Sequence, residues 1–300
     1  MHRYARLRPG PGFRADRTLL YYTQRMVTNP LARAASRRAI ASGINILHRK
    51  NSRPSNSAET VANTLKEKGC SPIGPLLTQD AAEGIRRQLL DKPVLVGSGD
   101  KECLLSELPA GTSTVNYSLK TVLDCEPLMQ IANHPYVLEI ASAYLGCNPT
   151  ISSIGLRWSF PRGNGLVSTQ HFHRDCDDWK FFKLFIYLTD VDLDTGPHVY
   201  IQHSHESPTT MLAKHYDEAQ LHRDHTEENF RTFVGPAGTT FLCDTYGIHK
   251  GMPPIKAPRL IYQVQYSLLP IYAFEYDPVK TPTAANYNRY INRLMMRDVK

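Results

Sequence analysis

Three His-x-Asp pairs are the residues of this chain whose types and spacing could do chemistry. Side chains alternate along an extended strand, so both members of such a pair point to one side and can bind one metal ion. A distant histidine would complete the two-histidine, one-carboxylate set that holds non-haem iron(II) and leaves coordination positions open. The pairs are His173/Asp175, His215/Asp217 and His222/Asp224.

The surroundings of the three pairs favour His173 and Asp175 as metal ligands. His215 and His222 lie in the polar stretch 212–229, whose charge density is typical of a solvated helix or loop. His173 instead lies between a glycine-containing loop at 162–166 and the β-prone run 180–189. We therefore expect the pair at 173 and 175 to bind the metal.

A third metal ligand and an anion-binding arginine come later in the chain. His249 follows the predicted strand 238–243 and its turn, and Arg259 opens the predicted strand 259–269. A guanidinium forms a planar, bidentate fork that matches a carboxylate. Arg259 is therefore a candidate to bind a carboxylate. Lys183, on the mixed face of strand 180–189, is a second residue that could bind a carboxylate. The alternative is that Lys183 lies at the rim of the cavity and is solvated by water.

These residues belong to a longer resemblance. The stretch from Leu65 to Leu269 resembles the phytanoyl-CoA dioxygenase-like family. The resemblance is carried by Gly69 with 74–78, by His173-Arg174-Asp175, by 188–191 with 195–200, and by His249 with Arg259. One position departs from the family, which usually has glycine before the Ser-His that closes segment 198–205. Here that position is His203, which puts the local turn in question but not the three ligands.

The resemblance implies an iron(II)- and 2-oxoglutarate-dependent dioxygenase. His173, Asp175 and His249 would be the catalytic metal ligands, and Arg259 and Lys183 would bind 2-oxoglutarate. Oxygen and this cosubstrate would be consumed with release of succinate and CO2. Related halogenases leave the carboxylate position empty for chloride, so Asp175 favours hydroxylation or desaturation of a small molecule. Which small molecule is left open, among acyl-CoAs, sugars or aminoglycosides, amino acids and secondary metabolites.

Two other functions use the same residues. A cupin-like isomerase or metal hydrolase would need the three ligands without 2-oxoglutarate, and Arg259 at the anchor position speaks against it. A non-catalytic jelly-roll binding module would carry vestigial ligands, and the complete set of three speaks against that.

The elements that must position these residues follow from the hydrophobic pattern. Helices are expected over 58–68, from Thr78 to about 90, and over 126–145 with a break at Pro135. After residue 148, short β-prone segments alternate with Gly and Pro breaks at 151–160, 180–189, 198–202, 238–243 and 259–269. The expected fold is mainly β with flanking helices, a double-stranded β-helix of the jelly-roll type shared with cupins.

Charge divides the chain into two parts. Residues 1–54 hold twelve Lys or Arg against Asp16 alone, whereas the remainder holds 23 basic and 27 acidic residues. We expect a basic N-terminal arm over 1–57, partly helical (31–48) or disordered, and an oxygenase domain over 58–300. The catalytic body should not bind nucleic acid. The arm could contact an anionic membrane surface weakly, or pack loosely as an exposed helix, and its foreign composition suggests that the chemistry does not need it.

The remaining composition indicates a cytoplasmic protein. The six cysteines contain no Cys-x-x-Cys pair, so they predict neither a zinc site nor a disulfide framework. No run reaches the roughly 18 apolar residues of a membrane span, and the N-terminus lacks a secretory apolar core. The oligomeric state does not follow from the sequence.

Overall fold

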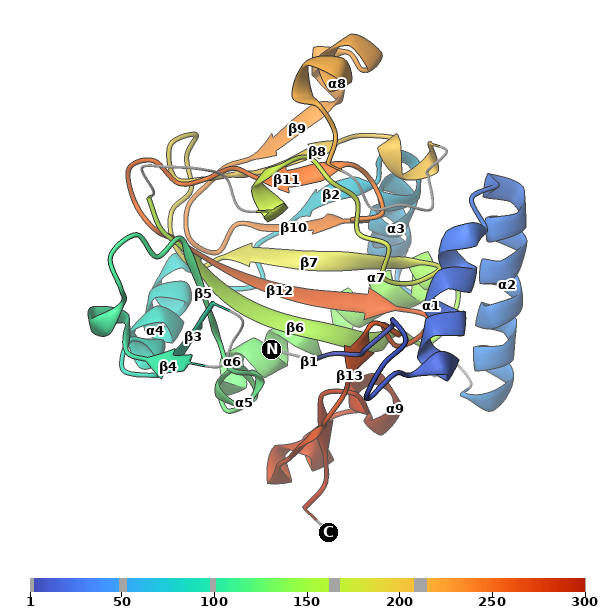
Figure 1. Cartoon of the computed structure of the whole chain (residues 1–300), viewed down its shortest axis with the longest axis horizontal. Coiled ribbons are helices and arrows are strands. Elements are labelled where there is room, and N and C mark those ends of the chain that lie inside the picture. Colours follow the sequence, from blue (N-terminus) through green and yellow to red (C-terminus); the bar gives the residue numbers. More distant parts are fainter. Residues whose placement is uncertain (1–2, 49–52, 98–100, 162–167, 208–214, 300) are drawn as a thin grey trace.

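An antiparallel sheet of eight strands forms the centre of the protein (Figure 1). The computed structural model describes residues 3–48, 53–97, 101–161, 168–207 and 215–299, so the loop expected at 162–166 and the start of stretch 212–229 lie outside the described residues. Across the sheet the strands run β2 (Cys70–Ile73), β10 (Thr240–Cys243), β7 (Phe181–Tyr187), β12 (Arg259–Ser267), β6 (Thr150–Ser159), β5 (Thr114–Tyr117), β3 (Val94–Val96) and β4 (Lys101–Cys103).

The two faces of this sheet differ because the side chains of its central strands alternate. In β7 and β12 the even-numbered residues are apolar or tyrosine, fully buried, and belong to the main core. The odd-numbered residues include Lys183, Arg259, Gln263 and Gln265, and they line a cavity. The predicted alternation, with a mixed face turned inward, is therefore confirmed for both strands.

A second, three-stranded antiparallel sheet faces the first. It consists of β11 (His249–Gly251), β8 (His198–Ile201) and β9 (Phe230–Phe233). Aromatic side chains from both sheets fill the space between them: Phe233 of β9 stacks on Phe241 of β10 with 4.1 Å between ring centroids, and Tyr200 belongs to the same buried cluster. Two antiparallel sheets packed face to face, with helices outside, confirm the expected jelly roll.

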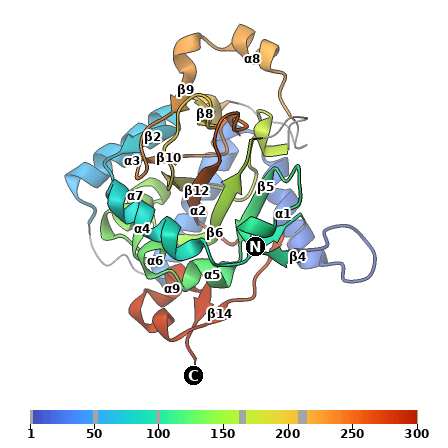
Figure 2. The same ribbon diagram turned by 90° about the vertical axis from the view of Figure 1, so that its left-hand side faces the viewer.

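Helices cover the outer face of the large sheet (Figure 2). Thr78 caps α4 by accepting a hydrogen bond from the backbone of Ala81, as its position predicted. Pro135 is the first residue of a new helix, because the first turn of a helix tolerates the missing N–H of proline. These helices are α3 (Asn56–Lys68), α4 (Gln79–Leu89), α5 (Leu119–Leu123), α6 (Glu126–Ala132), α7 (Pro135–Leu145) and α9 (Arg289–Asn292).

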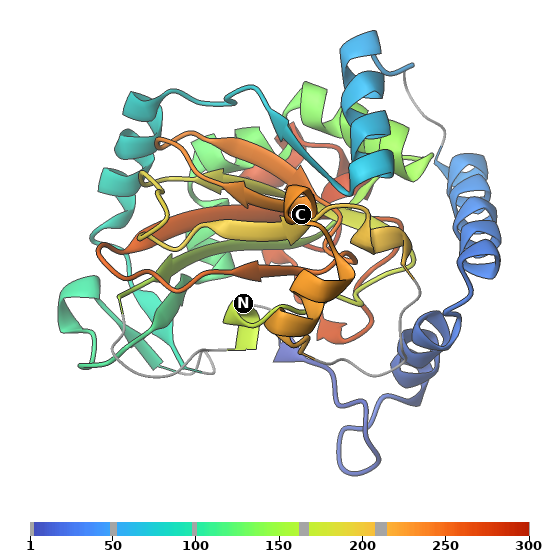
Figure 3. The same cartoon turned by 90° about the horizontal axis from the view of Figure 1, so that it is seen from above.

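The N-terminal segment packs on the body of the protein (Figure 3). Strand β1 (Arg3–Tyr4) pairs with β13 (Phe274–Glu275), and helices α1 (Ala15–Met26) and α2 (Pro30–Leu47) follow. Gln24 and Arg33 are 1% and 6% exposed, and they donate hydrogen bonds to backbone carbonyls of Cys176, Asp177 and Asp178. Helix α1 was not expected from the sequence, since its polar composition carries no clear apolar stripe.

The remaining elements are peripheral. Helix α8 (Glu218–Asp224) stands at the far side of the small sheet in Figure 1, and β14 (Val279–Lys280) pairs with β15 (Met296–Arg297) near the C-terminus. Among the described residues, no helix combines the length and the apolar character that crossing a bilayer requires.

Candidate active site

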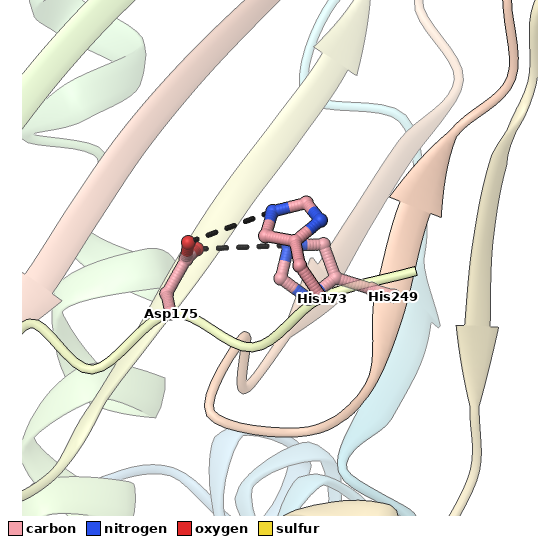
Figure 4. A group of neighbouring side chains, drawn as sticks. All are labelled: His173, Asp175 and His249. Atoms are coloured by element: carbon pink, nitrogen blue, oxygen red, sulfur yellow. Dashed lines mark ion pairs between the residues drawn. The ribbon is translucent and has the colours of Figure 1, made fainter. Parts of the chain in front are cut away.

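The structure brings His173, Asp175 and His249 together (Figure 4). One ligand atom from each lies within 4.8 Å of the others, close enough for all three to hold one metal ion. His173 and His249 exchange both backbone hydrogen bonds, of 2.9 and 3.0 Å, in a single antiparallel bridge. This bridge sets the two imidazoles beside each other with 4.3 Å between ring centroids.

Hydrogen bonds fix which nitrogen of each imidazole is free. Nδ1 of His173 lies 2.9 Å from the backbone carbonyl of His171, and Nδ1 of His249 lies 3.0 Å from that of Gly247. A carbonyl oxygen only accepts, so both Nδ1 atoms must carry the proton and both Nε2 atoms keep a lone pair. The two Nε2 atoms are 3.7 and 3.6 Å from the carboxylate oxygens of Asp175. Two lone pairs and a carboxylate facing one point form a donor set for a divalent transition metal.

His173 and Asp175 share one side of an extended segment, as the spacing predicted, although the segment is not part of a regular strand. Arg174 lies between them and also borders the cavity. Its guanidinium donates hydrogen bonds to the Tyr216 hydroxyl at 3.0 Å and to the Tyr246 carbonyl at 2.8 Å. These contacts, with the bridge to His249 and a bond from the Asp175 N–H to the Thr245 carbonyl, hold the segment extended.

Lys183 lies on Asp175 rather than beside Arg259. Its Nζ donates a hydrogen bond of 2.6 Å to Oδ2 of Asp175. Burial disfavours the charged carboxylate, but the lysine and then the two histidines outweigh this and hold the pKa of Asp175 below its ordinary value. Burial, followed by the charge of His173, lowers the pKa of His249 to about 3. At neutral pH this site therefore presents a carboxylate and neutral His249, as a metal requires.

The other two His-x-Asp pairs lie elsewhere. His222 is on α8, where its ring stacks on Phe230 and its Nδ1 lies 2.7 Å from Glu227. Asp217 caps the N-terminus of that helix. His215 is exposed and stacks on His171. Among the described residues, the only group of three or more potential ligands close enough to share a metal is the one at 173, 175 and 249.

A cavity of about 420 Å³ adjoins the three ligands. Its floor is the inward face of the large sheet, where Lys183, Gln263, Gln265 and Arg259 project together. Gly155 on β6 makes room here, because a Cβ at this position would lie 2.9 Å from the Gln263 amide. The polar faces of the two predicted strands thus converge on one pocket. Gln170 also lines it, whereas Trp179 packs against the main core.

Arg259 is the most isolated charge in this cavity. It is 6% exposed, and its hydrogen bond to a protein atom is a long one, 3.4 Å from Nη2 to Oγ of Ser159. Its Nε and Nη1 are buried and have no hydrogen-bond partner. Gly251 leaves space in front of it, since a Cβ there would come within 3.4 Å of Nη2. A buried guanidinium with unpaired donors, facing a cavity, is built to receive an anion.

Sequence reasoning missed several residues that line the site. His198 of β8 is 4% exposed and stacks on His249 at 5.4 Å between centroids, and burial holds its pKa well below the ordinary value. Arg157 lies on the inward face of β6, where small and polar residues alternate with Ile154, Leu156 and Trp158. That alternation was visible in the sequence and could have identified Arg157. Nothing in the sequence indicated that the N-terminal residues Tyr4, Tyr21 and Arg25 reach the same cavity.

Comparison with known proteins gives a family and a fold. Residues 111–253 match the family model described as phytanoyl-CoA dioxygenase (PhyH). Among curated proteins, no sequence matches. Solved structures are also similar to this chain, and three of them are described here. The epimerase SnoN in complex with Fe3+, alpha ketoglutarate and nogalamycin RO is 16% identical, with a TM-score of 0.53 over 70% of this chain and 83% of that one.

The other two structures are similar over more of their length. EctD from S. alaskensis is 15% identical, with a TM-score of 0.52 over 83% of this chain and 89% of that one. HygX from Streptomyces hygroscopicus, with nickel, 2-oxoglutarate and hygromycin B bound, is 13% identical, with a TM-score of 0.51 over 75% and 92%. At these identities the likeness concerns the fold. Residues 111–253 of this chain thus match the phytanoyl-CoA dioxygenase (PhyH) family model, and the solved structures named above share the fold of the chain.

Proposed function

We propose that the protein is a dioxygenase that hydroxylates a small molecule and converts 2-oxoglutarate to succinate and CO2. The iron(II) ligands would be His173, Asp175 and His249, and Arg259 would bind the far carboxylate of the cosubstrate. One observation carries the proposal. Three ligand atoms lie within 4.8 Å of one another beside a cavity that also contains a buried, largely unpaired guanidinium. The three clustered ligand atoms are what an iron(II) site requires. A dicarboxylate bound to that iron explains why a buried guanidinium lies unpaired beside it.

The bound metal and cosubstrate would together supply the activation of oxygen, and the residues of the chain prepare the site for them. The Nδ1 bonds to backbone carbonyls turn both Nε2 lone pairs toward Asp175. Lys183 holds Oδ2 of Asp175, which keeps the carboxylate ionised and limits its rotation. Arg259 loses little hydrogen bonding when it binds a carboxylate, because it has almost none to give up. The apolar cluster between the sheets, including Phe241 and Tyr200, excludes water behind the ligands.

Solved structures of similar fold that contain a metal and 2-oxoglutarate support the proposed function. SnoN was crystallised with Fe3+ and alpha ketoglutarate, and HygX with nickel and 2-oxoglutarate. We propose the same two components for this chain because its donor set suits a divalent transition metal. The small-molecule substrates named for those proteins are not transferred to this one.

Iron content and succinate formation test the proposal together. Protein reconstituted anaerobically should bind one iron(II), and oxygen with 2-oxoglutarate should then yield succinate even without substrate, by slow uncoupled turnover. His173→Ala and His249→Ala should lose the metal. His222→Ala is the matched control, because it removes a histidine from the exposed pair on α8. Loss of iron in that control would contradict the choice of ligands.

The same assay separates the two alternatives. A metal isomerase or hydrolase would bind the metal but show no succinate and no spectral response to 2-oxoglutarate. A binding module with vestigial ligands would bind no metal at micromolar concentration. Either outcome in the wild-type protein would overturn the proposed dioxygenase.

For the cellular setting we propose a cytoplasmic enzyme that acts on a diffusible small molecule and does not bind nucleic acid through its catalytic body. Weak membrane contact through the N-terminal segment fits the exposed apolar side chains of its helices, among them Leu19, Leu31 and Ile46 at 69%, 81% and 83% exposure. Arginines share these helices, and basic, amphipathic helices bind anionic lipid surfaces. Sedimentation with anionic vesicles measures this contact, and no binding at low salt would refute it.

A further inference from the structure

The cavity contains more positive charge than the proposed iron and cosubstrate can balance. Five basic side chains and two carboxylates line it: Arg25, Arg157, Arg174, Lys183 and Arg259 against Asp175 and Asp177. Iron(II) and the doubly charged 2-oxoglutarate would cancel each other. Three positive charges would then remain among these described residues. Such an excess favours a further anion.

Most of the basic residues already have a partner. Lys183 bonds to Asp175, and Arg174 bonds to Tyr216 and the backbone of Tyr246. Arg25 bonds to the Tyr21 hydroxyl, and it lies close enough to Asp177 to influence that carboxyl. Arg259 faces the position proposed for the cosubstrate. Arg157 and Arg174 therefore keep unbalanced charges, and of these Arg174 already donates two hydrogen bonds.

Arg157 has one hydrogen bond and no acidic partner. Its Nε donates to Oδ1 of Asn116 at 3.0 Å, across the β5–β6 pairing. No carboxylate of the described residues lies within salt-bridge distance of it, although the structure has fourteen such contacts elsewhere. The Asn116 bond fixes one edge of the guanidinium and leaves its outer nitrogens facing the cavity. A guanidinium fixed at one edge and free at the other can bind a carboxylate or phosphate as a planar fork.

The place of Arg157 separates it from the proposed cosubstrate position. On β12 its cross-strand neighbour is Ile261, whereas Arg259 is opposite Ser159. Arg157 therefore lies on the neighbouring strand β6, two residues out of register with Arg259. The N-terminal segment reaches the cavity, because the β1–β13 pairing sets Tyr4, which is 74% exposed, beside Phe274, with 5.1 Å between ring centroids. Burial and the charges of Asp177 and Asp175 raise the pKa of Tyr4, whereas Lys183 and, least, Arg157 lower it, so the phenol lies among the charged groups of the cavity.

We propose that Arg157 binds an anionic group of the substrate, a carboxylate or a phosphate, with the Tyr4 hydroxyl as a second donor. This inference rests on the proposed function and names its substrate class: small molecules with an acidic group some distance from the carbon that is oxidised. It also gives the N-terminal segment a role, since β1 carries Tyr4 to the cavity and Gln24 of α1 is bonded to the backbone directly after Asp175. Residues outside the matched family segment would then help select the substrate.

Paired probes that differ only in charge test this inference. Zinc-loaded protein with saturating 2-oxoglutarate is mixed with benzoate or benzamide, and with phenyl phosphate or phenol. Binding is followed by saturation-transfer NMR and by competition titration. We expect the acids to bind about tenfold or more tightly than their neutral partners, the scale of one charge-assisted contact. Tighter binding of benzoate than phenyl phosphate would indicate a carboxylate substrate, and the reverse order a phosphate.

Variants assign that preference to the residues. Arg157→Met should reduce acid binding to the level of the neutral probes, and Arg157→Lys should restore part of it. Tyr4→Phe should weaken only the acids. Arg223→Met, which removes an exposed arginine of α8, is the matched control and should change nothing. Folding of each variant is checked by its urea midpoint, and Arg157→Lys serves where Arg157→Met is unstable.

Two results would overturn the inference. One is equal binding of acids and neutral partners by the wild-type protein, including no binding of either. The other is an Arg157→Met variant that binds 2-oxoglutarate at least about tenfold more weakly while its probe preference is unchanged, because Arg157 would then serve the cosubstrate. Repeating the probe titrations without metal separates this inference from the proposed function, which fails only if the wild-type protein forms no succinate.

Discussion

Replacing Arg259 by methionine should change stability and cosubstrate affinity in opposite directions. Methionine keeps much of the length of the side chain and removes the guanidinium. In the cosubstrate-free protein Arg259 is 6% exposed, with Nε and Nη1 unpaired and a single long bond to Ser159. Burial, assisted by the like charge of Arg157, lowers its pKa, so the charged form is disfavoured where it stands. The native residue is therefore a source of instability that only a bound anion relieves.

The expected magnitudes follow from this environment. Each buried, unsatisfied polar group costs about 1–3 kcal/mol, so Arg259→Met should raise the free energy of unfolding of the metal-free protein by roughly that amount. Leaving a ligand carboxylate without its charged partner costs roughly 2–5 kcal/mol. That corresponds to a 2-oxoglutarate dissociation constant about 30-fold to several-thousand-fold higher. Iron binding should hardly change, because the three ligands are intact.

Two assays measure the two effects. Anaerobic titration of the iron(II) protein with 2-oxoglutarate, followed through the metal-to-ligand absorption, gives the affinity. Urea denaturation without metal or cosubstrate gives the stability, and Arg223→Met is the control for loss of an exposed arginine. Unchanged affinity for 2-oxoglutarate would refute the assignment of Arg259. A variant that loses both affinity and stability would show that Arg259 supports the fold rather than waiting for a ligand.

Three further predictions concern other parts of the chain. His203→Gly should be about 1 kcal/mol more stable than His203→Ala by urea denaturation, because His203 has a φ of 65° and both variants lose its bond to the Glu67 carbonyl; equal midpoints would contradict this. Burial lowers the pKa of Lys180 to about 8, below the ordinary 10.5, so between these two pH values the unfolded chain binds one proton more than the folded protein. The unfolding free energy of the wild type, relative to Lys180→Met, should therefore rise with pH in that window. A difference that does not change with pH would contradict the lowered pKa. A chain that begins at Ser55 should lose roughly 2–4 kcal/mol of stability, because Ala41 and Ile44 of α2 belong to the main core at 8% and 7% exposure; an unchanged urea midpoint would instead support the dispensable arm expected from composition.

The sequence was sufficient for the elements whose signals are local. Alternation in β7 and β12 predicted both strands and their inward faces, since residue type alone tells a half-polar surface from an apolar one. Thr78 and Pro135 marked the starts of two helices through capping and ring geometry. The unusual residue at position 203 was also readable. The departure from the family glycine put the local turn in question, and His203 adopts a left-handed backbone with a φ of 65° while its side chain and N–H bond to Glu67 and Lys68.

The choice among the three His-x-Asp pairs shows how far context reaches. Charge density around 212–229 suggested that His215 and His222 are solvated, and the structure places both on the surface. Context did not fix the partner of Lys183, for which the sequence left open a carboxylate of cosubstrate or substrate and a position in water at the rim. The 2.6 Å contact with Asp175 depends on how a loop crosses that strand.

Only the tertiary structure decided what lies opposite the large sheet. Arg157, Tyr4 and Arg25 come from three separate segments, and they meet at one cavity because β1 pairs with β13 and α1 packs on the loop after Asp175. The charge counts distinguish the first 54 residues from the rest of the chain. They contain no information about long-range pairing, so they could not show that this segment packs on the body. The basic N-terminus was thus recognised by its sequence, whereas its place beside the metal ligands was determined by contacts between residues more than 150 positions apart.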